Sequence, residues 1–279
     1  MYIIDGRKIR DEILAKVKKE VGLLPFQPIF CDVLVGEDPS STQYVRMKAE
    51  TAESVGMKFL NASFSASTAT EDLIKEIKVL NNIKNMCGII VQLPLPEMLD
   101  QKRILDAIDS RLDVDCLGKI AGEKFYSGRT AVQFPTALAC MKLLDSTAIS
   151  LKNKKIVVLG QGDLVGRPVA ALLKFRGFVT DVVIRATKNK ENLIKQADVI
   201  ISGIGQGEYI KGNMIKKGVV LIDAGTSESG GGIVGDVDLE SVKDVAGYVS
   251  PVPGGVGPVT VAMLLNNILA VAKSITHER

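Results

Sequence analysis

The sequence predicts an α/β protein of two α/β domains, the second a Rossmann-type, doubly wound parallel sheet. The chain has 279 residues, which is enough for two domains of ordinary size. Short apolar runs alternate along it with segments of helical periodicity, as strands and helices do in parallel sheets. The composition is 46% hydrophobic and 24% charged, so the chain can bury a core of its own.

In the first half, the periodicity predicts helices over 7–21, 40–55 and 70–80, and strands over 28–35, 57–62 and 87–91. Ser40 and Ser41 are expected to cap the helix that they begin, and Gly56 to end it. Pro94 and Pro96 closely follow the strand at 87–91. Because proline cannot donate a hydrogen bond to a sheet, the chain must leave the sheet there.

In the second half, the alternation predicts a helix over 163–176, a final helix over 260–274, and strands over 154–159, 179–184, 198–202, 219–223 and 247–250. The segment at 137–150 separates the two patterns, so we divide the domains at 140/141. The periodicity alone leaves open which domain the final helix packs on.

The net charge of +3 is too small to indicate a nucleic-acid-binding protein, although it suits a small polyanionic ligand. Cys31, Cys87, Cys116 and Cys140 have neither the spacing of a disulfide framework nor that of a metal site. The single histidine, His277, lies near the end of the chain, so we expect no histidine chemistry and no metal. Since neither an export signal nor a long apolar span is recognisable, we expect a cytoplasmic protein away from membranes.

A glycine-rich turn follows the strand at 154–159. Gly160, Gly162 and Gly166 have the spacing GxGxxxG between a strand and a helix, where glycines permit a tight turn and close approach of a phosphate. The start of the helix offers free N–H groups to a pyrophosphate, and we expect Asp163 to cap it. This pattern predicts a dinucleotide site; the alternative is a glycine turn in a sheet without a ligand.

The end of the next strand bears on the choice of dinucleotide. An NAD site usually has an acid there, whereas this chain has Arg185, Lys188 and Lys190, with no acid before Glu191. Because a guanidinium binds a phosphate through two parallel hydrogen bonds, we expect NADP rather than NAD. The alternative is a solvated basic loop.

Candidates for chemistry lie mainly in the first half. Tyr44 and Lys48 share one face of the predicted helix at 40–55, a pattern more typical of an ordinary surface when taken by itself. Gln92 follows a strand end, where α/β sheets bind ligands. Asp113 and Asp115 alternate, which predicts that both lie on one side of an extended segment.

A set of longer motifs stands in order along nearly the whole chain. They are Tyr44-Val-Arg-Met-Lys48, Val91-Gln-Leu-Pro-Leu-Pro96, Asp113-Val-Asp115, Val165-Gly-Arg-Pro168, Gly235-Asp-Val-Asp238 and Pro251-Val-Pro-Gly-Gly-Val-Gly-Pro-Val-Thr260. Together they resemble the bifunctional methylenetetrahydrofolate dehydrogenase/methenyltetrahydrofolate cyclohydrolase family. The resemblance implies a folate-binding catalytic domain over 1–140, an NAD(P)-binding domain over 141–261, and a last helix, 262–279, that returns to the first domain.

The resemblance also implies residue roles. Lys48 would be the catalytic lysine, oriented by a hydrogen bond to Gln92, with Tyr44 lining the folate pocket and Asp115 binding the amino edge of the pterin. Further substrate contacts would come from Val91, Leu93, Pro253, Gly254, Gly255, Val256 and Gly257. Contacts to the cofactor would come from Gly160, Gln161, Gly162, Val165, Gly166, Arg185 and Thr226.

The implied function is oxidation of 5,10-methylenetetrahydrofolate with NADP and hydrolysis of the methenyl product to 10-formyltetrahydrofolate. A desolvated lysine can shuttle the protons of that hydrolysis. The resemblance further implies a homodimer in one-carbon metabolism that serves purine biosynthesis. Departures from the family pattern at 116–118 and 134–137 leave open a dehydrogenase without the hydrolytic step. Another two-domain dehydrogenase and a non-catalytic nucleotide-binding regulator are further alternatives.

Overall fold

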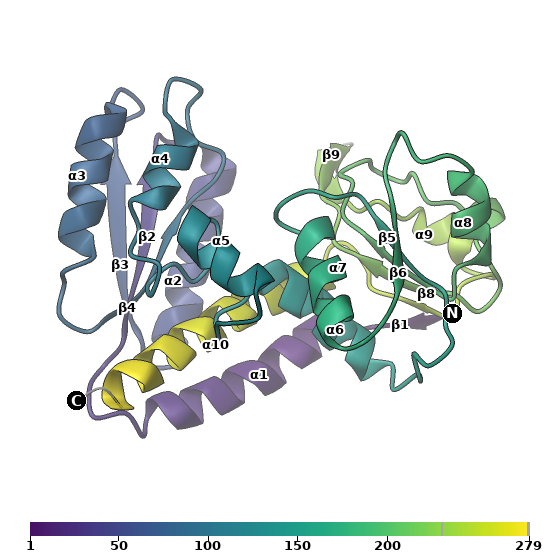
Figure 1. Cartoon of the computed structure of the whole chain (residues 1–279), viewed down its shortest axis with the longest axis horizontal. Coiled ribbons are helices and arrows are strands. Elements are labelled where there is room, and N and C mark those ends of the chain that lie inside the picture. The colour runs from purple at the N-terminus through teal and green to yellow at the C-terminus, as the bar shows by residue number, and fades with distance from the viewer. Residues whose placement is uncertain (230, 278–279) are drawn as a thin grey trace. The chain divides into compact units, whose positions relative to one another are not determined.

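The chain forms two compact units. The computed structural model describes residues 1–229 and 231–277; the side chain of His277, for which we expected no role, lies outside the described part. Unit 1 comprises Met1–Asp11 and Phe134–Met263, and unit 2 comprises Glu12–Gln133 and Leu264–Arg279. The two ends of the chain therefore belong to different units (Figure 1).

Unit 2 is built on a three-stranded parallel sheet (Figure 1). Its strands, in the order β3-β2-β4, are β3 (Lys58–Phe64), β2 (Ile29–Val35) and β4 (Met86–Val91). Its helices are α1 (Gly6–Val21, which begins in unit 1), α2 (Pro39–Ser54), α3 (Thr70–Leu80), α4 (Gln101–Asp106) and α5 (Lys119–Tyr126). Because β2 is central, its side chains are buried on both faces of the sheet, as its near-continuous apolar run requires.

The last helix, α10 (Val256–His277), packs with the core of unit 2, which confirms the return predicted for it. Gly88 in β4 makes this contact close, because a Cβ there would lie 2.7 Å from Cγ1 of Ile268. The helix begins before the predicted Thr260, since a proline at position 258 is tolerated in a first turn, where N–H groups have no helical partner. Within the described residues, Val256–Thr276 is the one stretch long and apolar enough to cross a membrane, and 61% of its most apolar window is buried in the protein.

Unit 1 contains a six-stranded, all-parallel sheet in the order β1-β11-β8-β7-β5-β6. Its strands are β1 (Tyr2–Ile3), β5 (Ile156–Leu159), β6 (Thr180–Val183), β7 (Val199–Ser202), β8 (Val220–Asp223) and β11 (Tyr248–Val249). The strand that follows β5 along the chain lies on one side of it and the next lies on the other side. The order thus reverses at β5, which is the position where doubly wound sheets bind ligands.

The remaining elements of unit 1 are mostly short. They are α6 (Pro135–Ser146), α7 (Gly166–Phe175), α8 (Lys190–Gln196), η1 (Gly212–Met214), α9 (Leu239–Val242) and an antiparallel hairpin of β9 (Ser227–Ser229) and β10 (Gly232–Val234). The division predicted at 140/141 falls inside α6, whereas the units divide at 133/134. The first residues lie in unit 1 rather than in the expected first domain, because the amide of Ile4 donates to the carbonyl of Val249 at 2.8 Å.

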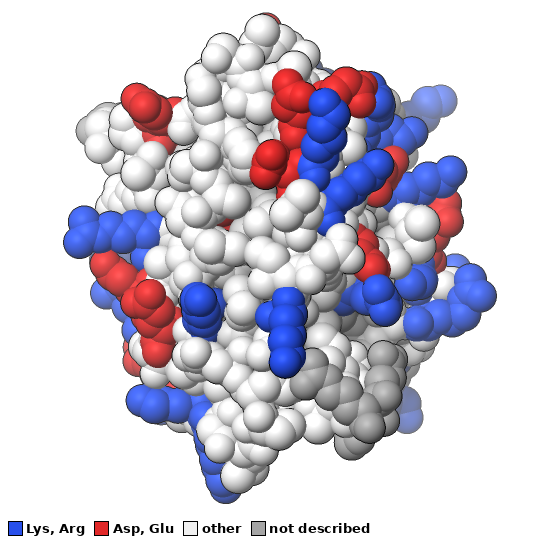
Figure 2. Space-filling model, turned by 90° about the vertical axis from the view of Figure 1, so that its left-hand side faces the viewer, with Lys and Arg blue, Asp and Glu red and all other residues white. Residues whose placement is uncertain are grey.

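Figure 2 shows the side of the molecule that lies at the left of Figure 1, where α3 is found. Basic and acidic side chains are interspersed on this face rather than gathered by sign. This agrees with the small net charge of +3, and the absence of a nucleic-acid partner stays a prediction.

Candidate functional site

The position of Lys48 follows from the start of α2. Asp38 caps this helix by accepting a hydrogen bond from the amide of Ser41 at 2.7 Å, so the predicted cap by Ser40 and Ser41 is wrong. A proline at the first helical position suits the start, because its missing N–H would have no partner there. The resulting phase turns Lys48 inward together with Val45, and the lysine side chain is only 2% exposed.

The ammonium of Lys48 is surrounded by three groups. It forms an ion pair with Oδ2 of Asp32 at 2.6 Å and donates a hydrogen bond to Oε1 of Gln92 at 2.8 Å. It also lies 4.9 Å from the centre of the Tyr44 ring, within the range of a cation–π contact. Lys48 is therefore not an ordinary surface lysine, and the hydrogen bond expected between Lys48 and Gln92 is present.

Gln92 is held in one orientation at the end of β4. Its backbone amide donates to the carbonyl of Val33 at 2.9 Å, and its Nε2 donates to the carbonyl of Leu93 at 2.8 Å. Because the amide nitrogen is engaged, the amide oxygen is the atom presented to Lys48. The side chain of Val91 is buried, whereas Leu93 is half-buried beside Gln92.

Asp32 is the member of this cluster that the sequence patterns did not single out. It lies in the middle of β2, and its side chain is 0% exposed. Burial raises the pKa of Asp32, and the neighbouring Lys48 ammonium opposes this rise. The available signal was an acid within an otherwise apolar strand, since an unpaired carboxylate is rarely buried.

Asp113 and Asp115 have different surroundings, so the prediction that both lie on one side of an extended segment is wrong. The segment turns, with Cys116 at a positive φ of 60°. Asp113 is buried and accepts a hydrogen bond from the amide of Gly118 at 2.7 Å. Asp115 is half-buried; burial raises its pKa to about 7, the Lys48 charge opposes the rise, and the carboxylates of Asp113 and Asp32 add to it.

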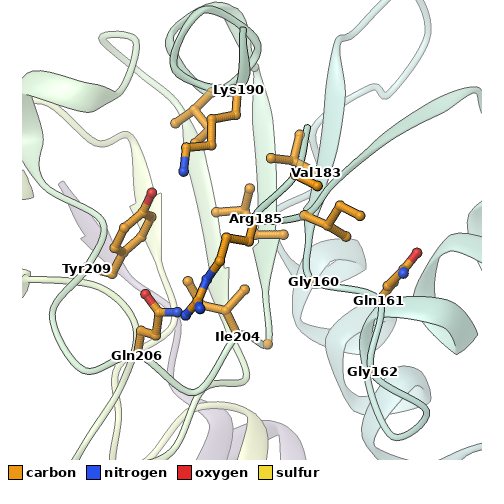
Figure 3. Close-up of a pocket in the computed structure, with 14 residues that line it drawn as sticks. Gly160, Gln161, Gly162, Val183, Arg185, Lys190, Ile204, Gln206 and Tyr209 are labelled. Atoms are coloured by element: carbon orange, nitrogen blue, oxygen red, sulfur yellow. The ribbon is translucent and has the colours of Figure 1, made fainter. Parts of the chain in front are cut away.

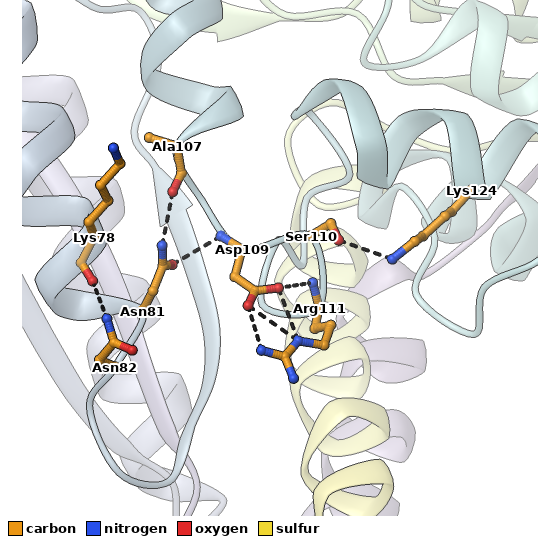
Figure 4. Close-up of polar contacts among 8 residues, drawn as sticks. All are labelled: Lys78, Asn81, Asn82, Ala107, Asp109, Ser110, Arg111 and Lys124. Atoms are coloured by element: carbon orange, nitrogen blue, oxygen red, sulfur yellow. Dashed lines mark hydrogen bonds and ion pairs between the residues drawn. The ribbon is translucent and has the colours of Figure 1, made fainter.

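The segment that carries Asp115 is braced by its neighbours. Asn81 donates to the carbonyl of Ala107 at 2.9 Å and accepts from the amide of Asp109 at 3.0 Å (Figure 4). The Asp109 carboxylate binds the guanidinium of Arg111, with a shortest contact of 2.6 Å, as Figure 4 also shows. From α10, Nδ2 of Asn267 donates to the carbonyl of Val114 at 2.9 Å. The segment is therefore bonded to side chains from two other parts of the chain, Asn81 after α3 and Asn267 in α10.

The predicted substrate loop, Pro253–Gly257, lies in unit 1. Gly254 has a φ of +105°, which favours glycine, and a Cβ on Gly6 would lie 2.0 Å from the carbonyl oxygen of Gly255. The side chain of Val256 is buried, and its predicted contact with the substrate stays a prediction. Pro253 and Gly257 are exposed.

A cavity of about 510 Å³ lies at the carboxyl ends of β5, β6 and β7, where the strand order reverses. Four of the predicted cofactor residues line it: Gly160, Gln161, Gly162 and Arg185. Figure 3 shows the glycine turn on one side of the cavity and Gln206 and Tyr209 on the other, with Arg185 between them and Lys190 pointing in. An open glycine edge next to two cations can accept a phosphorylated ligand.

The other predicted cofactor residues do not line this cavity. A Cβ on Gly166 would lie 2.2 Å from the carbonyl oxygen of Gly160, so this glycine permits the tight turn rather than reaching the space. Val165 packs on Gly203, and Thr226 is exposed in another loop. Asp163 forms an ion pair with Arg167 at 2.6 Å and does not cap α7, contrary to our expectation, because the helix begins only at Gly166. Gly162 has open space around its Cβ position, as a phosphate cradle requires.

Asp236, within the Gly235–Asp238 motif, holds the far side of the cavity. Its buried carboxylate accepts hydrogen bonds from Oγ of Ser202 at 2.6 Å and from the amides of Ile204 and Gln206 at 2.9 and 2.8 Å. Since Ile204 and Gln206 line the cavity, Asp236 fixes the shape of that wall. Within the part of the chain that the structure describes, no group of three or more His, Cys, Asp or Glu side chains is arranged to hold a metal ion.

Comparisons with known proteins agree over both units. The family described as "Tetrahydrofolate dehydrogenase/cyclohydrolase, catalytic domain" matches residues 4–115, and its NAD(P)-binding domain matches residues 135–276. The curated "Bifunctional protein FolD" of Halothermothrix orenii is 40% identical over 276 residues, which cover 97% of this chain and 98% of that protein.

Two solved structures are also similar. The bifunctional enzyme FolD, a methylenetetrahydrofolate dehydrogenase/cyclohydrolase from Campylobacter jejuni, has a TM-score of 0.94 at 35% identity, covering 99% of each chain. The FolD of Trypanosoma brucei, solved with NADP cofactor and an inhibitor, has a TM-score of 0.93 at 34% identity, covering 99% of this chain and 98% of that one.

Proposed function

The chain belongs to the tetrahydrofolate dehydrogenase/cyclohydrolase family, and we propose that it oxidises 5,10-methylenetetrahydrofolate with NADP and hydrolyses the methenyl product to 10-formyltetrahydrofolate. The observation that carries the hydrolytic step is the buried Lys48 ammonium bound by Gln92. A dehydrogenase that had lost hydrolysis would have no use for a desolvated lysine held in this way. Its retention therefore favours the bifunctional enzyme.

Lys48 is proposed to move the protons of the hydrolysis. As water adds to the methenyl carbon, a nearby amine nitrogen can take up the water proton and later return one to the leaving ring nitrogen. Gln92, fixed through Leu93, keeps Nζ of Lys48 in place for both transfers. Tyr44 is proposed to pack on the ring system of the folate, and Asp115 to accept hydrogen bonds from its amino edge. Val91, Leu93 and the Pro253–Gly257 loop are proposed as further substrate contacts.

The cavity beside Gly160 is proposed to bind NADP. The open space at Gly162 suits a pyrophosphate, and the Arg185 guanidinium and the Lys190 ammonium can bind the additional phosphate that distinguishes NADP from NAD. The T. brucei FolD binds NADP, which supports this choice. When bound, the dinucleotide supplies the hydride acceptor, and the residues of this chain supply binding and orientation.

We further propose a cytoplasmic homodimer that supplies one-carbon units to purine biosynthesis. The β6 edge of the six-stranded sheet supports the dimer, because apolar side chains are exposed near this edge. The exposed fractions are 48% for Phe175, 89% for Val179 and 38% for Val182. An open sheet edge with exposed apolar side chains can pair with a second copy. Sedimentation should show a dimer that Val182→Lys weakens, and a wild-type monomer at micromolar concentration would exclude it.

Two spectrophotometric assays test the proposed activities. Methylenetetrahydrofolate is added with NADP or with NAD, and methenyltetrahydrofolate is added without any nucleotide. We expect faster reduction of NADP than of NAD, and hydrolysis above the buffer rate. Loss of hydrolysis alone would leave a dehydrogenase. Turnover only with other substrates would indicate another dehydrogenase, and nucleotide binding without turnover would indicate a regulator.

A further inference from the structure

The buried carboxylate of Asp32 differs from the other buried acids of the described chain. Asp113, Asp223 and Asp236 each accept hydrogen bonds from backbone amides, as acids with a structural role do. Apart from the Lys48 ammonium, the described residues give neither oxygen of Asp32 a hydrogen-bond partner. Asp32 thus carries the full desolvation cost of a buried charge, with a single compensating contact.

Its location explains why a proton can move within this contact. Asp32 lies on the central strand β2 and Lys48 on α2, with exposed fractions of 0% and 2%. In such a dry site, desolvation penalises the two separated charges and brings the neutral acid–amine pair closer in energy to the ion pair. The Oδ2–Nζ distance of 2.6 Å allows the proton to pass directly between the two atoms.

We propose that Asp32 is a positioning residue for hydrolysis, which acts through Lys48 by holding Nζ beside Gln92 and by taking one of its protons while water adds to the methenyl carbon. The proposal rests on the role proposed above for Lys48. It assigns to Asp32 the second half of a relay: Lys48 touches the reacting water, and Asp32 stores the proton that this water gives up.

The proton balance of the relay closes without an oxidant or reductant. As the water oxygen bonds to the carbon, the Lys48 ammonium gives a proton to Oδ2 of Asp32, and the lone pair freed on Nζ takes a proton from the water. The adduct is then neutral, and the pair holds one extra proton. When the bond from carbon to one ring nitrogen breaks, Nζ donates a proton to that nitrogen and takes the hydroxyl proton as the carbonyl forms. Because Asp32 is fully buried, the stored proton returns through Nζ of Lys48 and leaves to solvent once the product has gone.

Three further titratable groups lie near the pair and bear on the pH range of the test. Cys31 lies beside Asp32 on β2, Tyr44 comes from α2, and Asp115 comes from the turn after β4. Burial raises the pKa of Cys31 and of Tyr44 to about 12 each, so both stay neutral in the working range. Asp115, whose pKa burial raises to about 7, titrates within that range. The pH profile of hydrolysis in Asp115→Asn shows which part of the wild-type profile is due to the titration of Asp115.

The test compares the pH dependence of methenyltetrahydrofolate hydrolysis in wild type and Asp32→Asn. Without the carboxylate, the base is the neutral amine of Lys48 alone. We therefore expect the acid limb to move toward higher pH by at least about one unit, and the rate at pH 7 to fall about 10- to 100-fold. NADP affinity should not change. Cys31→Ala is the matched control, because it alters the neighbouring buried position of the same strand without touching Lys48; it should keep the wild-type pH profile.

A second variant keeps the proposal falsifiable should the asparagine disturb folding. Asp32→Ala leaves a space in which formate can replace the carboxylate, and we expect added formate to restore part of the hydrolysis. A wild-type pH profile in Asp32→Asn, absence of rescue in a folded Asp32→Ala, or failure of both variants to fold while Cys31→Ala folds would each overturn the proposal. Unchanged hydrolysis in Lys48→Met would instead overturn the proposed role of the lysine.

Discussion

The two units use cationic side chains in opposite ways. In unit 2, Lys48 is buried and compensated by Asp32 and Gln92. In unit 1, Arg185 is exposed and Lys190 half-buried at an open cavity, and neither forms an ion pair with a described residue. A buried, compensated cation can exchange protons, whereas an exposed, uncompensated one is available to a phosphate. The difference fits the proton transfer proposed for unit 2 and the phosphate binding proposed for unit 1.

Of the variants that test this comparison, Lys48→Met should have the largest effect, on the rate of hydrolysis. The variant keeps an unbranched side chain one atom shorter and cannot carry a proton, so we expect hydrolysis to fall by about three orders of magnitude. NADP binding, measured by fluorescence titration, should stay within about twofold, because the cavity lies in unit 1. Hydrolysis at the wild-type rate would remove Lys48 from the mechanism.

Arg185→Ala should weaken NADP binding about 10- to 100-fold, which corresponds to the loss of a charge-assisted hydrogen bond to phosphate, and should change NAD binding little. In the wild-type protein, the difference between the affinities for NADP and for NAD should become smaller at high salt. Lys188→Ala is the matched control, since Lys188 is exposed in the same loop but does not line the cavity. An equal loss of affinity for NADP and for NAD would show that Arg185 does not bind the additional phosphate of NADP.

Asp236→Asn should weaken NADP and NAD binding alike, by about tenfold. The substitution places an N–H₂ group against amides that now donate to the carboxylate, which disturbs the wall formed by Ile204 and Gln206. Competition binding with both nucleotides distinguishes this effect from that of Arg185→Ala. A loss confined to NADP would contradict it.

Asp115→Asn should have the smallest effect, on stability. Burial raises the pKa of Asp115 from 3.8 to about 7, so its favourable contribution is fully present below pH 3.8 and is lost as the pH rises through about 7. The variant does not titrate and should gain stability relative to wild type between pH 5 and pH 8. Two pH units correspond to about 2.7 kcal/mol, and solvent screening of the half-buried carboxylate reduces the expected gain to about 1–2 kcal/mol. Urea unfolding at both pH values measures this; a difference that does not change with pH would contradict it.

The order of elements was predictable because it depends on local periodicity. The strands and helices of the first half, up to β4, lie close to their predicted positions, and so does the glycine turn after β5. The helices α4, α5, α6, α8 and α9, the strand β1 and the β9–β10 hairpin were not predicted. All except α6 are too short to carry a clear periodicity, and α6 lies in the segment that we interpreted as the domain boundary. The capping predictions failed at Ser40 and Asp163, since the residue that caps depends on where the chain first turns.

For the candidate site, the sequence by itself determined the kinds of chemistry present: Lys48, Gln92, a glycine turn and Arg185 in a recognisable order. Only the tertiary structure decided that Asp32 faces Lys48, that Asp113 and Asp115 have different surroundings, and that Asp236 shapes the wall of the cavity beside Gly160. The physical reason is that these relations join residues far apart in the chain. The local sequence pattern determines which side chains of a helix or strand point toward the core. The packing of the elements then determines which partner each buried charge contacts.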